Sequence, residues 1–74
     1  MGLPVVSGRE VIKALCRAGF RVVRQRGGHV RLEKGTEDRM IKLTVPLHKS
    51  LKKGTLRRII KDAGLTVEDF NRLL

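Results

Sequence analysis

Residues 29–45 contain two stretches in which apolar and polar side chains alternate, and this pattern restricts the chain to folds with a β-sheet. Residues 29–33 read HVRLE and residues 40–45 read MIKLTV. A period of two places alternate side chains on opposite faces of a strand. We therefore expect strands at 29–33 and 40–45, the second ended by Pro46. Val30 and Leu32 then face the core, and His29 points away from it.

The segment before these stretches predicts a third strand and a tight hairpin. Residues 20–25 read FRVVRQ, which is rich in strand-forming residues, and Gly27-Gly28 suits a two-residue connection. Residues 35–38 (GTED) indicate a second turn. Three strands joined by two short turns predict a three-stranded antiparallel sheet.

Helical spacing of apolar residues precedes and follows the predicted sheet. Ser7 and Glu10 have the spacing of a capping box, so we expect a helix at about 8–18. A second helix is expected to have Thr55 as its cap, and a short last helix follows Thr66. The apolar positions assigned to these helices are Val11, Ile12, Leu15 and Cys16; Leu56, Ile59, Ile60 and Ala63; and Val67, Phe70 and Leu73.

The predicted order of elements is α-β-β-β-α with a short extra helix at the C-terminus, which indicates an α+β fold. One face of a three-stranded antiparallel sheet needs cover, and the amphipathic helices can supply it from one side. We expect residues 1–74 to form one domain. A chain of this size buries only about 60% of its unfolded surface, so burial against a partner protein would add stability.

The charge of the chain favours a polyanionic partner. Seventeen Lys and Arg residues against seven Asp and Glu residues give a formal net charge of +10. The basic residues are also segregated, because no acid lies between Glu10 and Glu33 or between Asp38 and Asp62. A charged surface that serves solubility alone usually mixes both signs. We therefore expect the chain to bind nucleic acid.

The scarcity of aromatic residues indicates how nucleic acid would be bound. Phe20 and Phe70 are the only aromatic residues, and both lie in apolar patterns typical of a core. Little remains for a platform on which bases could stack. We therefore expect binding through phosphates and shape.

His29 is the candidate catalytic residue, because it lies on the polar face of a predicted strand among arginines. Arg24, Arg26 and Arg31 could hold a phosphate beside it, and Gly27-Gly28 would let the ligand backbone approach closely. A neutral imidazole can take the proton of an RNA 2′-hydroxyl group, and guanidinium groups can stabilise the charge that develops at phosphorus. A plain surface histidine is the alternative interpretation.

Two further basic segments are candidate phosphate-binding sites. His48 follows the last strand, and either protonates a leaving oxygen or only contacts phosphate or solvent. Lys52 and Lys53 precede the second predicted helix, whose unpaired amides favour anions. Arg57, with Arg58 and Lys61, extends this basic surface along the helix.

Other chemistries find little support in the sequence. The acids are scattered, and two histidines with one cysteine match no familiar zinc spacing, so we expect no metal and no other cofactor. Cys16 lies in an apolar helical pattern and is expected in the core. The chain has neither a membrane-spanning apolar stretch nor the layout of a signal peptide, and the lone cysteine suits a reducing compartment. We therefore expect a cytoplasmic protein.

The chain resembles the HicA family of bacterial and archaeal toxin components over nearly its whole length. The stretches that carry the resemblance are SGREVIKAL at 7–15, AGF at 18–20, VRQRGGH at 23–29, VPLH at 45–48 and KKGTLRRIIKDAGL at 52–65. Singly these motifs are weak, but their order and spacing are specific.

This resemblance implies a fold like that of double-stranded-RNA-binding domains and cleavage of mRNA without a metal. It also implies inhibition by a HicB antitoxin that covers the active site. The catalytic histidine of the family falls on His29. Members of the family usually have Gly-Ser-His at this place, whereas Gly28 stands here at the position of the serine.

Two other functions remain open from the sequence. The first is a module that binds double-stranded RNA through the same basic surface without cleaving it. The second is a small DNA-binding regulator, which is disfavoured because no helix-turn-helix spacing is evident. The leading hypothesis is an endoribonuclease toxin whose partners are mRNA and a HicB-like antitoxin.

Overall fold

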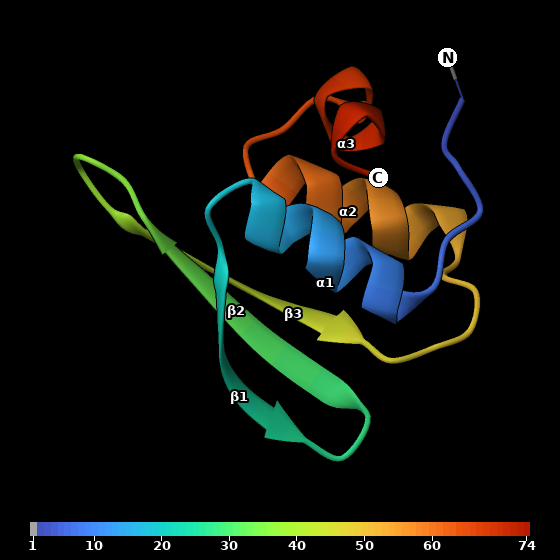
Figure 1. Ribbon diagram of the computed structural model, residues 1–74, viewed down its shortest axis with the longest axis horizontal. Helices are drawn as coiled ribbons and strands as arrows, with labels where there is room; N and C mark the ends of the chain where they lie inside the picture. The colour runs from blue at the N-terminus through green and yellow to red at the C-terminus, as the bar shows by residue number, and fades with distance from the viewer. Residues whose placement is uncertain (1) are drawn as a thin grey trace.

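The computed structural model describes residues 2–74 and confirms the α+β fold and the order of its elements (Figure 1). No helix among these residues has the length and apolar character needed to cross a membrane. The elements are α1 (Gly8–Arg17), β1 (Arg21–Arg26), β2 (His29–Gly35), β3 (Met40–Pro46), α2 (Lys53–Asp62) and α3 (Val67–Leu73).

The three strands form one antiparallel sheet in the order β1-β2-β3, as predicted. The hairpin between β1 and β2 turns at Gly27, whose φ of 57° lies in the left-handed region that glycine adopts at low cost. The pairing shifts between Val22 and Arg24, so Val23 is an extra residue in a β-bulge. Both β1 and β3 are edge strands.

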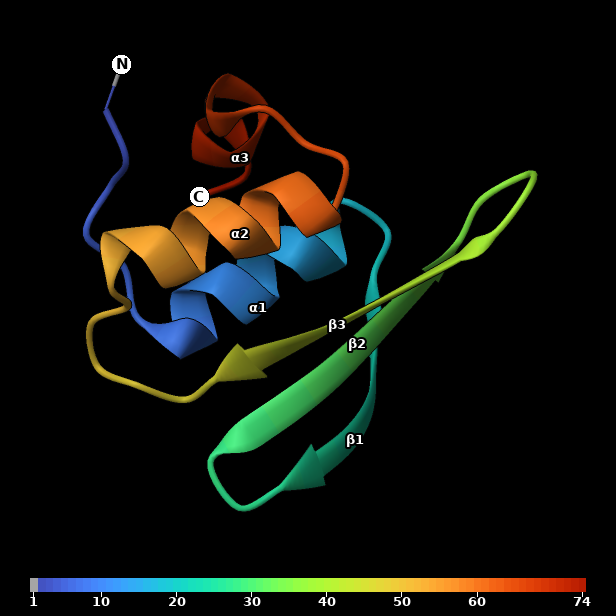
Figure 2. The ribbon, with the colours of Figure 1, turned by 180° about the vertical axis from the view of Figure 1, so that it is seen from behind.

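The helices cover one face of the sheet. Figures 1 and 2, which view the molecule from opposite sides, place α1 and α2 on the same side of the sheet and α3 beyond them. α3 packs against α1 and α2 through Phe70, whose side chain is fully buried. Buried apolar side chains from β2, β3 and all three helices form one core: Val11, Leu15, Val30, Leu32, Leu43, Val45, Leu56, Ile59, Ile60 and Phe70 are among them.

Two of the three predicted helix starts are confirmed. Ser7 forms a capping box with Glu10, and Thr66 forms one with Asp69. Hydrogen bonds from the backbone and side chain of Thr66, with a smaller contribution from Arg72, hold the pKa of Asp69 below its ordinary value. The predicted cap at Thr55 is wrong: α2 begins at Lys53, and its N-cap residue Lys52 makes no side-chain hydrogen bond to the helix.

The prediction that Cys16 lies in the core is also wrong, because its side chain is exposed. The buried stripe of α1 contains Gly8, Val11, Ala14 and Leu15. Cys16 follows Leu15 by one residue, which turns it about 100° around the helix axis and away from the sheet. Its helical spacing from Ile12 follows the edge of the apolar face, where Ile12 itself is only half-buried.

Candidate nucleic-acid interface

His29 lies in a small hollow on the side of the sheet that the helices leave open. The hollow has a volume of about 130 Å³ and is lined by Arg24, Arg26, His29, Arg31 and Thr44. We call it the His29 hollow. It joins the predicted catalytic residue to the three arginines predicted to bind phosphate beside it.

The strand register explains why these side chains meet. Arg26 pairs with His29, Arg24 pairs with Arg31, and Arg31 pairs with Thr44. Residues directly opposite each other in antiparallel strands share a face of the sheet. The hollow is therefore built from two neighbouring rows of side chains, one of which crosses all three strands.

The arginines of the His29 hollow are free to bind an anion. Every residue of β1 is exposed, and so are His29 and Arg31. None of the three guanidinium groups forms an ion pair with a carboxylate anywhere in residues 2–74. Three cations close together without acids favour a bound anion, and phosphate suits the planar donor groups of arginine.

The glycine pair of the hairpin leaves the approach to this hollow open. Within residues 2–74, a Cβ atom added at Gly27 or Gly28 would meet no atom within 4 Å beyond its immediate chain neighbours. The amide of Leu47 donates a hydrogen bond of 2.7 Å to the carbonyl of Gly28. This bond ties the hairpin to the segment that follows β3 and so fixes the position of His29.

The other predicted phosphate-binding residues lie outside the His29 hollow. His48 is exposed, its side chain does not line the hollow, and its carbonyl accepts a hydrogen bond of 2.9 Å from the amide of Gly8. Lys52 and Lys53 lie at the start of α2, and Arg57 is exposed one turn further along the helix.

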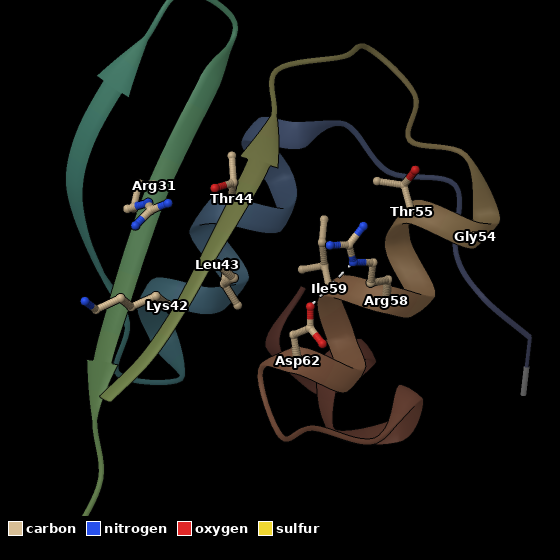
Figure 3. A pocket seen from close by; sticks show the side chains of 9 residues that line it. All are labelled: Arg31, Lys42, Leu43, Thr44, Gly54, Thr55, Arg58, Ile59 and Asp62. Carbon is tan, nitrogen blue, oxygen red and sulfur yellow. Dashed lines mark ion pairs between the residues drawn. The ribbon is translucent and has the colours of Figure 1, made fainter. Parts of the chain in front are cut away.

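A larger groove of about 410 Å³ runs between β3 and α2 (Figure 3). We call it the β3–α2 groove. Arg58 and Asp62 face it from α2, with 3.7 Å between Nε of Arg58 and Oδ2 of Asp62. The residues that line it are Arg31, Lys42, Leu43, Thr44, Gly54, Thr55, Arg58, Ile59 and Asp62.

A comparison with known protein families finds a family that matches most of the chain. The family described as "HicA toxin of bacterial toxin-antitoxin" matches residues 8–65 of the 74. The chain belongs to the HicA toxin family. A comparison with curated proteins gives no significant match.

The part of this HicA chain that matches the family contains all the residues of the His29 hollow and of the β3–α2 groove. α3 lies beyond the match and packs on the far side of α1 and α2 from the sheet. Sequence reasoning overlooked Lys42 and Thr44 as site residues, although the alternation in 40–45 already predicted that both point away from the core.

Proposed function

We propose that this HicA-family chain is the toxin of a toxin–antitoxin system and acts as an endoribonuclease that cleaves mRNA without a metal ion. The observation that carries the proposal is the grouping of His29 with Arg24, Arg26 and Arg31 in one open hollow. An imidazole supplies the acid or base, and the guanidinium groups supply the electrophilic stabilisation. The family resemblance supports the same assignment.

In the proposed reaction His29 acts as the general base. Its neutral imidazole takes the proton of a ribose 2′-hydroxyl group, and the 2′-oxygen attacks the adjacent phosphorus. The bond from phosphorus to the 5′-oxygen of the next nucleotide breaks, and that oxygen takes a proton from water. The products are a 2′,3′-cyclic phosphate and a free 5′-hydroxyl group. Because the nucleophile is the 2′-hydroxyl group, DNA is not a substrate.

The three arginines hold the scissile phosphate and stabilise the charge that develops on its non-bridging oxygens. Guanidinium groups bind phosphate through paired donors and do not lose their charge at any working pH. The hollow is exposed, so solvent screens these contacts and the contribution of each is smaller than in a buried site.

We propose a HicB-like antitoxin as the protein partner. The assignment to a toxin family of toxin–antitoxin systems supports a pairing of this kind. The exposed edge strand β1 supports a location beside the His29 hollow, because Val22 and Val23 are 49% and 41% exposed there. A partner that covered β1 would bury both valines and block access to Arg24 and Arg26.

The test compares variants of the two histidines. Purified protein is expected to cleave mRNA in the presence of EDTA and to leave a cyclic or 3′-phosphate end. His29→Ala is expected to lose about 10²–10⁴-fold in rate while it retains most of its RNA binding. His48→Ala is the matched control and is expected to cleave within a few-fold of the parent, because His48 does not line the hollow.

Two outcomes would contradict the proposal. Equal cleavage by His29→Ala and the parent would remove His29 from the catalytic role. Salt-dependent binding of double-stranded RNA that stays intact on long incubation would instead show a binding module without catalysis.

A further inference from the structure

The His29 hollow is the first of three neighbouring basic cavities along β3. The His29 hollow and the β3–α2 groove share Arg31 and Thr44 as lining residues. The groove in turn shares Lys42 and Asp62 with a third hollow near the turn between β2 and β3. The three cavities therefore follow one another along β3, and we call this series of cavities the β3 track.

Positive charge is distributed along the whole β3 track. Among residues 2–74, Asp62 is the only acid that lines these cavities, and Arg58 lies beside its carboxylate. Side chains two residues apart on a strand lie roughly 7 Å apart on one face, a spacing that suits successive phosphates of an extended chain. The cationic residues that line the track are Arg24, Arg26, Arg31, Lys42, Arg58, Arg39 and Lys61.

We propose that the β3 track binds the backbone of single-stranded RNA that continues from the phosphate held at His29. This inference rests on the proposed function, because it takes the His29 hollow as the point of cleavage. Phe20 and Phe70 are both buried, so neither offers a surface for stacked bases. The track therefore recognises phosphates with little base preference.

The proposed chemistry requires an unpaired strand at the point of cleavage. The attacking 2′-oxygen and the leaving 5′-oxygen must come into line with phosphorus, and a regular A-form helix does not allow this alignment. Sequence positions flanking the cleaved bond must therefore be unpaired. Such a strand would follow the β3–α2 groove, which Arg58 and Asp62 face from α2 (Figure 3).

Of two neighbouring arginines on α2, one lines the β3 track and the other does not. Both Arg57 and Arg58 are exposed, but Arg58 lines the β3–α2 groove and Arg57 lines none of the three cavities. In the same way Lys42 lines the track and Lys49, in the loop after β3, does not. These pairs provide variants with the same change in formal charge at different positions.

The experiment measures RNA binding in a His29→Ala background, in which the RNA stays intact. A fluorescent single-stranded RNA of about 12 nucleotides is titrated with Lys42→Ala/Arg58→Ala and with the control Lys49→Ala/Arg57→Ala. The track variant is expected to bind about tenfold more weakly at low salt. Its slope of log K against log salt is expected to shrink by about 1.4, at about 0.7 for each lost phosphate contact. The control removes the same formal charge outside the track, so its affinity is expected to fall less than that of the track variant.

Equal effects of the two double variants would overturn the track, because only overall charge would then matter. It would also be overturned if the track variant lost affinity for polyglutamate and kept its affinity for RNA, which would indicate an acidic protein partner. Cleavage by the same double variants with His29 intact is measured separately. If binding depends on Lys42 and Arg58 but no protein cleaves RNA, the track stands and the catalytic proposal fails.

Discussion

Gly8→Ala is a sensitive test of how the segment after β3 is held against α1. Gly8 is the first residue of α1 and is buried. A Cβ atom at this position would lie 2.1 Å from the carbonyl oxygen of Pro46 and 3.0 Å from Cα of Leu47. Both neighbours are backbone atoms, so rotation of a side chain cannot relieve the clash. The amide of Gly8 also donates to the carbonyl of His48 at 2.9 Å.

The expected loss of stability is about 2 kcal/mol. Overpacking of a well-packed site costs about 1–3 kcal/mol, and a weakened amide hydrogen bond adds about 1 kcal/mol. The better helix propensity of alanine returns at most about 1 kcal/mol. For a chain of 74 residues, a loss of about 2 kcal/mol lowers Tm by roughly 8–16 °C.

Thermal and urea unfolding followed by circular dichroism measures this loss, and Gly54→Ala is the matched control. Gly54 is also in the first turn of a helix, but a Cβ atom there meets nothing within 4 Å. The control is expected to be as stable as the parent or up to about 1 kcal/mol more stable. The reasoning is refuted if Gly8→Ala unfolds within about 0.5 kcal/mol of the parent. Because Pro46 pairs with His29, Gly8→Ala should also slow RNA cleavage below its melting temperature.

Three further variants test the site and the last helix. Gly28→Ser has open space for its side chain, and the φ of Gly28 is not positive. This variant should keep its stability and cleave RNA about fivefold faster, because the hydroxyl group can add one hydrogen bond to phosphate. An unchanged cleavage rate would show that the hydroxyl group is not needed. Arg24→Ala is expected to unfold within about 0.5 kcal/mol of the parent and to lose roughly tenfold in cleavage rate; a large fall in stability would contradict a purely functional role. Because the pKa of Asp69 is lowered in the folded protein, its ionised carboxylate stabilises the folded state at neutral pH. This contribution is lost as the pH falls below about 4. Asp69→Asn should therefore be less stable than the parent at pH 7, and thermal unfolding of the two proteins should converge in acid.

The fold was predictable because most of its signals are local. The alternation in 29–33 and 40–45 specifies two strands, and the capping boxes at Ser7 and Thr66 specify two helix starts. The errors fall where tertiary packing decides. Whether Cys16 is buried depends on how widely α1 contacts the sheet, and α2 starts two residues before Thr55 without any side-chain cap.

The grouping of residues in the candidate site was predictable only where these residues lie within one hairpin. A two-residue turn fixes Arg26 opposite His29, so the sequence itself groups the histidine with the arginines of β1 and β2. Thr44 joins them through the pairing of β2 with β3, across a longer turn whose register the sequence does not specify. Arg58 was distinguishable from Arg57 only after the rotation of α2 against β3 was known.

The arrangement of β1 explains how a chain this small can carry so exposed a site. The bulge at Val23 leaves Val22 and Gln25 on the helix side of the sheet, opposite Leu32 and Val30 of β2. No residue of β1 is buried even so, and β2, β3 and the helices supply the core. The strand that carries Arg24 and Arg26 therefore contributes little buried apolar area, and substitutions there change charge and shape at the hollow at little cost in stability. The same exposure leaves an edge strand with two half-exposed valines, which favours coverage by a partner protein.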